Sequence, residues 1–280
     1  MDVLPGRLRA SSARRLASGA LRRGGRVSGV ALVTGASSGL GKGLARRLAA
    51  EGWAVGLAAR RAEALTALAG EIRAAGGRAL PVPTDVAERE AVHDAVRAVE
   101  EALGPVDLLV ANAGVSEMTV PDELDAERVE FLCRVNYLGA VYAVEAVLPG
   151  MLERRRGHLV AVSSLVAFGG LPLTAAYSAS KAALTNFFES LRIDLRPRGV
   201  DVTVISPGYV RTPMTEANRH RMPFLVEADD AVERMMRSIR RRRPAFAFPR
   251  PLSTFVWLAQ VFPRGLYDRI AARVRREKRR

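Results

Sequence analysis

The sequence has one cysteine and three lysines among its 280 residues. The lone cysteine, Cys133, excludes an internal disulfide bond, and no group of cysteines and histidines has the spacing of a zinc site. We therefore expect no bound metal and a reducing compartment, which favours the cytoplasm.

Long apolar runs are also missing. The almost uninterrupted apolar run at residues 252–262 is far shorter than the roughly 20 residues that a membrane-spanning helix needs. Hydrophobic residues nevertheless make up 49% of the chain, which is enough for one sizeable core. This length lies within the range of a single α/β domain, and we expect one domain.

Acidic residues are scarce at both ends of the chain, so its net charge of +14 is unevenly distributed along the sequence. Residues 1–27 carry seven arginines against one acid, a net +6, and residues 237–280 carry fourteen basic residues against two acids, a net +12. The body between them therefore carries −4. This argues against a broad nucleic-acid-binding face, and we expect no nucleic-acid partner. The basic tails either meet an anionic surface or are solvated ends of an arginine-rich chain.

What the sequence does contain is a repeated alternation of short apolar runs and segments of helical periodicity. It begins with VALVT at 30–34 and continues to AFAF at 245–248. The alternation predicts right-handed βαβ units in a Rossmann-like, doubly wound α/β domain, with a parallel sheet of about seven strands and helices on both faces. Helices are expected near 62–75, 88–103, 122–152, 175–196 and 227–241. We place this domain at 28–250, between a flexible basic arm at 1–27 and an apolar and basic extension at 251–280.

The glycine-rich turn TGASSGLG at 34–41 has the features of a dinucleotide site. Its glycines let the backbone approach a pyrophosphate, and a helix beginning near Ser38 would point free N–H groups at the same anion. A glycine motif alone also fits an ordinary tight turn, but its place between a strand and a helix favours a dinucleotide. The candidate cofactor-binding residues here are Gly35, Ser37, Ser38, Gly39 and Leu40.

The end of the second expected strand indicates which dinucleotide binds. An acidic residue at that place holds the ribose 2′-hydroxyl of NAD, whereas an arginine accommodates the 2′-phosphate of NADP. Ala59 stands where the acid would be, and Arg60 and Arg61 follow it. We therefore predict NADP, with NADPH preferred over NADH and Arg60 as a contact. The alternative is that both arginines are merely solvated.

One of the few lysines stands in the segment YSASK, four residues after Tyr177. Residues at this spacing share a helical face, and a nearby ammonium lowers the pKa of a tyrosine by favouring its phenolate. The compact charge of Lys181 could also donate to ribose hydroxyls. Ser163 and Ser164 end the preceding strand, where a reacting carbonyl could lie. The same tyrosine and lysine spacing also arises by chance on many helices.

The ordered set of motifs resembles the short-chain dehydrogenase/reductase family. The resemblance covers about residues 28–212 and rests on TGASSGLG, TDV at 84–86, ANAG at 111–114, Asn136, Ser164, YSASK and PGYVRT at 207–212. It implies that Tyr177 is the general acid and that Ser164, rather than Ser163, holds the substrate oxygen. Lys181 would lower the pKa of Tyr177 and bind the nicotinamide ribose, and Asn136 would anchor a water that relays protons to it. The remaining cofactor contacts that it implies are Asp85, Asn112, Gly114, Pro207, Gly208 and Thr212.

We therefore expect an oxidoreductase that transfers a hydride between NADP(H) and a small carbonyl or alcohol substrate. Apolar residues in a lid at 212–226, among them Met214 and Phe224, favour an apolar substrate, whereas His220 in this lid is expected to be solvated. The alternative is a membrane-recruited NADP-binding sensor without turnover, which Ser164, Tyr177 and Lys181 disfavour. Nucleic-acid binding through the tails ranks last.

The two tails leave further alternatives open. In the C-terminal extension, Leu266, Ile270 and Val274 recur every fourth residue among arginines, which predicts a basic amphipathic helix. It could lie on an anionic membrane, which would make the protein peripheral, or its apolar residues could cover the core or a partner subunit. Because this end differs from that of many family members, a homo-oligomer stays open. The N-terminal arm is rich in Arg, Ser and Ala, like a transit peptide or a flexible cytoplasmic arm.

Overall fold

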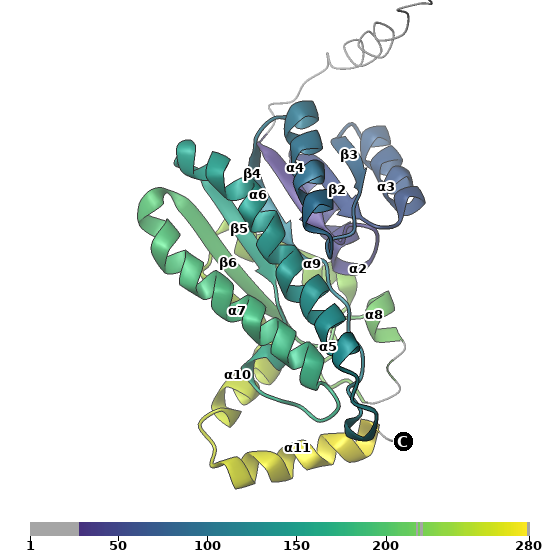
Figure 1. The fold of residues 1–280 in the computed structure, drawn as a ribbon, viewed down its shortest axis with the longest axis vertical. Coiled ribbons are helices and arrows are strands. Elements are labelled where there is room, and N and C mark those ends of the chain that lie inside the picture. The colour runs from purple at the N-terminus through teal and green to yellow at the C-terminus, as the bar shows by residue number, and fades with distance from the viewer. Residues whose placement is uncertain (1–27, 217, 219–220, 279–280) are drawn as a thin grey trace, which may run out of the picture.

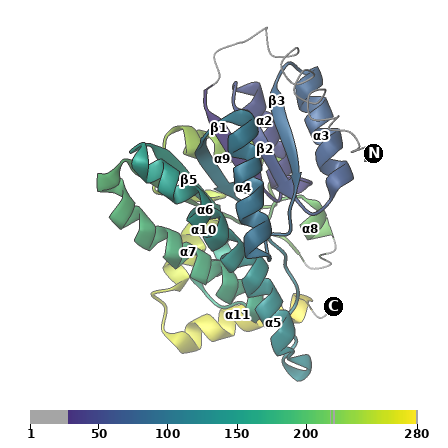
Figure 2. The same cartoon turned by 45° about the horizontal axis from the view of Figure 1, so that its top comes forward.

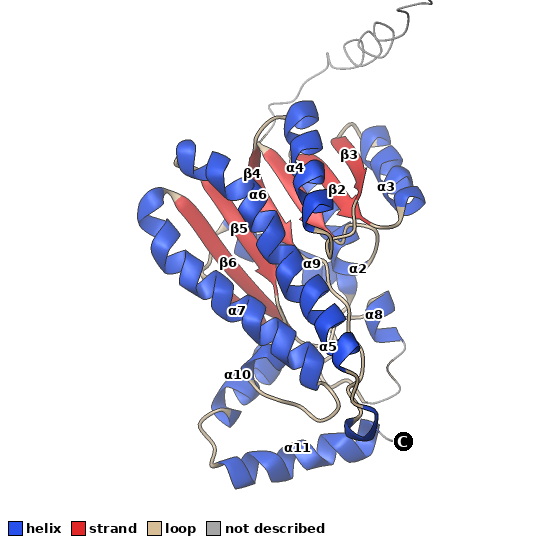
Figure 3. Cartoon of the chain, in the orientation of Figure 1, coloured by secondary structure: helices blue, strands red, loops and turns tan. Residues whose placement is uncertain are grey.

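The computed structural model describes residues 28–278 except 217, 219 and 220, with side chains described to residue 273 (Figure 1). The expectations for the arm at 1–27, for His220 and for the side chain of Val274 fall outside the described residues. Within them, strands and helices alternate along the chain, as the sequence predicts (Figure 3).

Seven parallel strands form one sheet in the order β3-β2-β1-β4-β5-β6-β7. The order reverses between β1 and β4, the switch point at which such sheets bind ligands. The prediction of a doubly wound α/β domain is confirmed, and AFAF is the last strand. The strands are β1 Val30–Thr34, β2 Ala54–Ala59, β3 Arg78–Pro83, β4 Val106–Ala111, β5 Gly157–Val162, β6 Val200–Pro207 and β7 Ala245–Phe248.

Two layers of helices cover the two faces of the sheet, because alternate side chains of each strand point to opposite faces. Ala31 and Val33 of β1 pack into the core beneath α2, α3 and α9, whereas Val30 and Leu32 pack into the core beneath α4, α6 and α7. The helices of the first layer are α2 Gly39–Ala50, α3 Ala62–Ala74 and α9 Ala228–Arg240; those of the second are α4 Arg89–Leu103, α6 Gly139–Glu153 and α7 Ala175–Leu195. In Figure 1, α4, α6 and α7 lie in front of the sheet.

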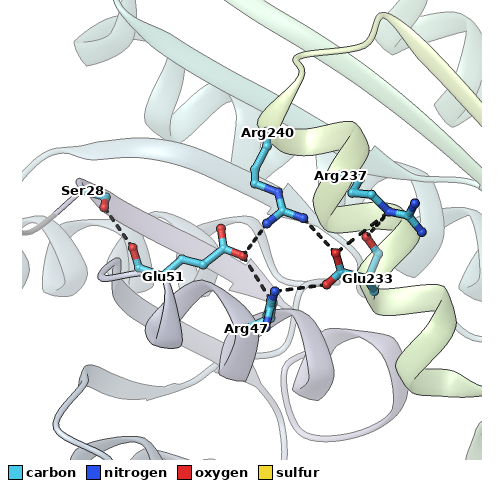
Figure 4. Close-up of polar contacts among 6 residues, drawn as sticks. All are labelled: Ser28, Arg47, Glu51, Glu233, Arg237 and Arg240. Carbon is cyan, nitrogen blue, oxygen red and sulfur yellow. Dashed lines mark hydrogen bonds and ion pairs between the residues drawn. The ribbon is translucent and has the colours of Figure 1, made fainter.

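A network of ion pairs joins α2 to α9 across the first layer (Figure 4). Glu233 accepts from Arg47 at 3.2 Å and from Arg240 at 2.9 Å, and Glu51 accepts from the same two arginines at 3.1 and 3.2 Å. These side chains are partly exposed, so each pair contributes little by itself. The network fixes the C-terminal end of α2, whose other end carries the glycine-rich turn.

The segment expected as one helix at 122–152 is divided. A 3₁₀ turn covers Pro121–Glu123, and α5 (Ala126–Cys133) begins after Asp125, whose Oδ1 accepts from the backbone N–H of Glu127 at 2.9 Å. A π-helical turn at Arg134–Leu138 then joins α5 to α6. Single π turns inside helices are frequent at functional sites, and this one holds Asn136.

The stretch from α5 to α6, Ala126–Glu153, is the one described helix that is long and apolar enough to cross a membrane by length and composition. Its residues Ala143, Val147 and Met151 are buried against the sheet, so it is a core helix of the domain.

After β7 the chain forms two further helices, α10 (Arg250–Ala259) and α11 (Arg264–Lys278). Figures 1 and 2 place both at the end of the sheet where β5 and β6 finish. The short helix α8 (Pro213–Glu216) and the 3₁₀ turn η3 (Leu165–Phe168) lie at the same end.

Candidate functional site

A cavity of about 460 Å³ opens at the carboxyl ends of β1, β2, β4, β5 and β6. Apart from Asn136, every residue predicted to bind cofactor or take part in catalysis lines it. Segments that are far apart in the sequence meet there because all the strands are parallel and finish at one edge.

The glycine-rich turn forms one wall of the cavity and is closed against the end of β4. Gly35 has φ +68°, and a Cβ atom there would lie 2.8 Å from Cα of Ala113. A Cβ atom at Gly41 would lie 2.3 Å from the carbonyl oxygen of Gly35. Only glycine therefore fits at both positions, and the turn leaves its backbone exposed at the start of α2, which suits a pyrophosphate.

Thr34 and Asn112 hold this turn in place. The hydroxyl of Thr34 accepts from the backbone N–H groups of Asn112 and Ala113 at 3.0 and 3.1 Å, and Nδ2 of Asn112 donates to the carbonyl oxygen of Thr34 at 2.9 Å. Asn112, predicted as a cofactor contact, thus has a clear positioning role. Gly114 follows it along the cavity wall.

Two arginines end β2 beside the turn. Arg60 and Arg61 both line the cavity, and the guanidinium of Arg61 donates to the hydroxyl of Ser37 at 3.0 and 3.2 Å. Ser37 lies in the glycine-rich turn, so the arginines stand next to the expected phosphate site. The last residue of β2, Ala59, is buried and carries no carboxylate.

The two serines at the end of β5 have different surroundings. Ser163 is buried, and its hydroxyl bonds the carbonyl oxygen of Lys181 at 3.2 Å and the hydroxyl of Thr185 at 2.7 Å. Ser164 instead lines the cavity beside the phenol of Tyr177, and its hydroxyl accepts from the N–H of Val166 at 3.3 Å. Ser163 therefore fastens α7 to the sheet, while Ser164 is the serine available to a substrate.

Burial sets the protonation of Tyr177. Desolvation raises the pKa of Tyr177, and the hydrogen bond from Ser164 lowers it by a smaller amount. This differs from the expectation that Lys181 would lower the pKa of Tyr177. The physical reason is that loss of water around the phenolate outweighs the hydrogen bond that stabilises it. Tyr177 is therefore a protonated phenol at neutral pH, able to donate its proton.

Lys181 is buried at 4% exposure, and its Nζ donates to the carbonyl oxygen of Val162 at 2.9 Å. No salt bridge in the described part of the chain involves it, and burial lowers its pKa to about 8. An uncompensated cation of this kind is common at functional sites, because such burial is otherwise unfavourable.

Asn136 lies behind the cavity wall rather than in it. Its side chain accepts from the N–H of Val115 at 2.7 Å and donates to the carbonyl oxygen of Val115 and to Ser180, both at 2.9 Å. A Cβ atom at Gly114 would lie 3.1 Å from Oδ1 of Asn136 and 3.3 Å from Nζ of Lys181. The asparagine and the lysine thus face the same small space beside Gly114, and Asn136 holds the backbone at Val115 next to the amine of Lys181.

The end of β6 supplies the opposite wall. The N–H of Gly208 donates to the carbonyl oxygen of Phe248 at 2.7 Å, and a Cβ atom at Gly208 would lie 2.9 Å from Cδ2 of Leu252 in α10. Pro207 and Thr212 line the cavity beside it. Asp85, on the far side, uses its carboxylate to accept from the N–H of Ala87 at 3.0 Å.

Comparison with known proteins identifies the family. The family model described as short chain dehydrogenase matches residues 29–223. The chain belongs to the short-chain dehydrogenase family. An uncharacterized oxidoreductase from Myxococcus xanthus (strain DK1622) is 49% identical over 245 residues, which cover 88% of this chain and 97% of that protein.

Solved structures of short-chain dehydrogenases are also similar. One from Burkholderia phymatum, in complex with NAD, gives a TM-score of 0.76 at 28% identity over 82% of this chain and 92% of that one. L-sorbose reductase from Gluconobacter frateurii, complexed with NADPH and L-sorbose, gives 0.73 at 27% identity over 80% and 96%. This short-chain dehydrogenase is thus an oxidoreductase, and its glycine-rich turn fits a nicotinamide cofactor.

Sequence reasoning missed some residues of this short-chain dehydrogenase site. Thr34, the first residue of the TGASSGLG motif, closes the turn through its hydroxyl, and its place directly before Gly35 is the sequence signal for this role. Arg61 was noted but not assigned, and only the structure distinguishes it through its bond to Ser37. Among the described residues, no group of three or more His, Cys, Asp or Glu side chains is placed to hold a metal ion.

Proposed function

We propose that this short-chain dehydrogenase transfers a hydride between NADP(H) and an apolar carbonyl or alcohol substrate. The observation that carries the proposal is the convergence of Ser164, Tyr177 and Lys181 in one cavity with the glycine-rich turn and the two arginines at the end of β2. The comparisons give no support to a non-catalytic sensor.

In the proposed reduction, a bound nicotinamide cofactor supplies the hydride to the carbonyl carbon. Tyr177 donates its phenolic proton to the carbonyl oxygen, and Ser164 donates a hydrogen bond to the same oxygen. The raised pKa of Tyr177 suits this direction, because the phenol is protonated before the reaction. The carbonyl substrate therefore gains one hydride and one proton and becomes the product alcohol.

Lys181 has a separate part in this proposal. As its pKa lies at about 8, the amine is largely protonated at neutral pH and can donate to a ribose hydroxyl or return a proton toward Tyr177. Asn136 fixes the backbone at Val115 and faces the same space as the amine, which supports a role in positioning a proton path to Lys181.

The preference for NADP over NAD rests on the end of β2. Arg60 and Arg61 both line the cavity, Arg61 donates to Ser37, and Ala59 supplies no carboxylate to hold a 2′-hydroxyl. A 2′-phosphate would gain charge-assisted hydrogen bonds there, whereas the 2′-hydroxyl of NAD would offer the arginines no negative charge.

An apolar substrate is supported by Met214 at the cavity and by the exposed Phe224 of the same lid segment. Met214 lines the cavity and is 46% exposed, and Phe224, on the same lid, is 57% exposed. The two ends of the lid segment are held together where Val210 pairs with Val226. A cytoplasmic location, proposed from the lone cysteine, fits the use of NADPH for reduction.

The test is a fluorescence titration of the full chain with NADPH and with NADH, which needs no substrate. We expect tight binding of NADPH, weaker binding of NADH, and a loss of about tenfold in NADPH affinity in Arg61→Ala and Arg60→Ala, since each removes a cation beside the phosphate. Arg97→Ala, an exposed arginine on α4, is the matched control. Equal binding of NADH would contradict the preference for NADP, and binding of neither would contradict the proposed reaction itself.

A further inference from the structure

We propose that the C-terminal helices of this short-chain dehydrogenase dock on the surface of an anionic lipid bilayer. The docking face consists of four apolar side chains and four arginines on α10, α11 and the turn between them: Phe255, Trp257, Leu258, Val261, Arg250, Arg264, Arg269 and Arg273. All eight are exposed.

Helix α10 exposes its larger apolar side chains to solvent. Its inward face is made of Leu252, Val256 and Ala259, and Leu252 packs at the end of β6. Its outward face carries Phe255 at 47% exposure and Trp257 at 65%. A helix that only covered its own core would have the opposite arrangement, so the outward face is built for contact with something else.

The exposed patch continues beyond α10. Leu258 is 44% exposed and Val261, in the turn that follows, is 75% exposed. With Phe255 and Trp257 they cover the half of α10 that lies opposite Leu252, Val256 and Ala259. Aromatic side chains of this kind settle at the boundary between headgroups and acyl chains, where an apolar ring can be buried near water.

The net positive charge of the docking face indicates which kind of partner it binds. The arginines of the docking face are opposed by one acid of this region, Asp268, and residues 274–280 add five more basic residues and one acid by sequence. Basic residues close to an anionic membrane surface are attracted to its headgroups and strengthen binding. The apolar face and the cations together therefore match an anionic bilayer.

A second copy of the chain fits the face less well. A two-fold contact would place the same surface against itself, so the arginines of one copy would face those of the other. Like charges brought together in an interface are unfavourable, and too few carboxylates lie here to pair with them.

Docking in this way would bring the cavity close to the membrane. Helix α10 packs beside Gly208, a cavity residue, and beside Leu165 of η3, the turn that follows Ser164. In Figures 1 and 2 the two C-terminal helices lie at the carboxyl end of the sheet. An apolar substrate could then enter from the bilayer, an extension that rests on the proposed function, whereas the docking itself does not.

The test uses the full chain and vesicles of phosphatidylcholine, with or without phosphatidylglycerol, in a flotation assay. We expect the protein to bind the anionic vesicles alone, and salt to weaken this binding.

The protein has two tryptophans, and Trp53 precedes β2 at the opposite end of the sheet. Vesicles with a quencher on their acyl chains should therefore quench the emission of Trp257 and leave that of Trp53, and quenching should vanish in Trp257→Phe.

A paired substitution, Phe255→Ser with Trp257→Ser, should lower the vesicle affinity by about tenfold or more, as it removes most of the insertable apolar area. The control is Ile193→Ser, because Ile193 on α7 is 68% exposed but lies outside the docking face. NADPH binding should be unchanged in both variants, which separates this proposal from the proposed function.

Three results would overturn the proposal. Vesicle binding that is equal in the paired variant would assign it to another region, such as the basic segment 1–27. Absence of any binding to anionic vesicles would exclude the bilayer. A dimer of the wild type that becomes monomeric in the paired variant, measured by sedimentation without vesicles, would identify a second copy as the partner.

Discussion

Nζ of Lys181 donates to the carbonyl oxygen of Val162 at 2.9 Å, in a part of the site where the described residues offer it no carboxylate. The sheet itself thus holds the amine in place, and Ser164 follows this carbonyl along the chain. Because a single backbone oxygen compensates little of the cost of burying a cation, the pKa of Lys181 falls to about 8.

This burial predicts an unusual alkaline stability profile. The folded pKa lies below the ordinary value of 10.5, so between about pH 8 and 10.5 the unfolded chain binds a proton that the native protein does not. Stability contributed by this group therefore rises with pH across that window, by about 3 kcal/mol for a shift of this size.

The comparison of wild type with Lys181→Met isolates that effect. Urea unfolding at pH 7.5 and pH 10 should show wild type gaining stability relative to the variant as pH rises. The two proteins differ only at position 181, so the difference between their pH profiles isolates this group. A difference between the two proteins that is constant with pH would mean that Lys181 is not buried as a cation.

His158 predicts a loss of stability in acid. It is buried on β5 at 5% exposure and bonds Thr203 at 2.8 Å, and its pKa is lowered to about 4, mainly by burial and further by the nearby Arg242, with Asp201 opposing. Between pH 6.5 and 4 the unfolded chain binds a proton that the native protein does not, so stability falls by about 3 kcal/mol across that window.

His158→Gln keeps a hydrogen-bonding group beside Thr203 but removes the titration. Its free energy of unfolding should decline less than that of wild type between pH 7 and pH 4.5. His93→Gln, a partly exposed histidine paired with Glu145, is the matched control. An equal decline in wild type and His158→Gln would contradict the account.

Gly41→Ala should damage cofactor binding more than folding. The added Cβ atom would lie 2.3 Å from the carbonyl oxygen of Gly35, a contact that the backbone of the turn must relieve by moving. We expect a loss of about tenfold or more in affinity for the nicotinamide cofactor, since the N–H groups of the turn would leave their positions. Gly70→Ala, on α3 with nothing near its Cβ position, is the control. Unchanged affinity in Gly41→Ala would mean that this turn does not carry the cofactor.

Tyr267 links the last helix to the active-site loop. Its hydroxyl donates to the carbonyl oxygen of Gly170 at 2.7 Å, across 97 residues, and this loop follows Ser164. Tyr267→Phe removes this hydrogen bond and should destabilise the observed conformation of the loop by about 1 kcal/mol. We therefore expect KM to rise about fivefold, while the Kd of the cofactor stays unchanged. Tyr142→Phe, on α6, should change neither. A KM equal to that of wild type would show that α11 does not support the substrate side.

Much of the fold could be predicted from the sequence because local chemistry decides it. The run VALVT coincides with β1, and the expected helices at 62–75 and 175–196 agree with α3 and α7 to within one residue at each end. The exception is the expected helix at 122–152, where the π turn around Asn136 depends on contacts with Val115. Helical periodicity contains no signal for such a contact.

The candidate site could likewise be predicted only where a local sequence pattern indicates it. The glycines and the pair Tyr177 and Lys181 could be located, because their spacing along the chain is typical of their functions. The bond from Arg61 to Ser37 and the link from Tyr267 to Gly170 could not, because each joins segments that only the folded chain brings together. The pKa of Tyr177 was expected to fall through Lys181, but burial, which the sequence does not reveal, raises it.

The most direct test of the central claim is the turnover of Tyr177→Phe. Wild type and variant would be incubated with NADPH and a panel of apolar ketones and aldehydes, with NADPH oxidation followed by absorbance and NADPH affinity measured in parallel. We predict that wild type oxidises NADPH with at least one member of the panel, and that the variant binds NADPH with a similar Kd but loses about 10²–10⁴-fold in turnover, since the proton donor is gone. Turnover in the variant equal to that of wild type would contradict the assignment of Tyr177 as the acid.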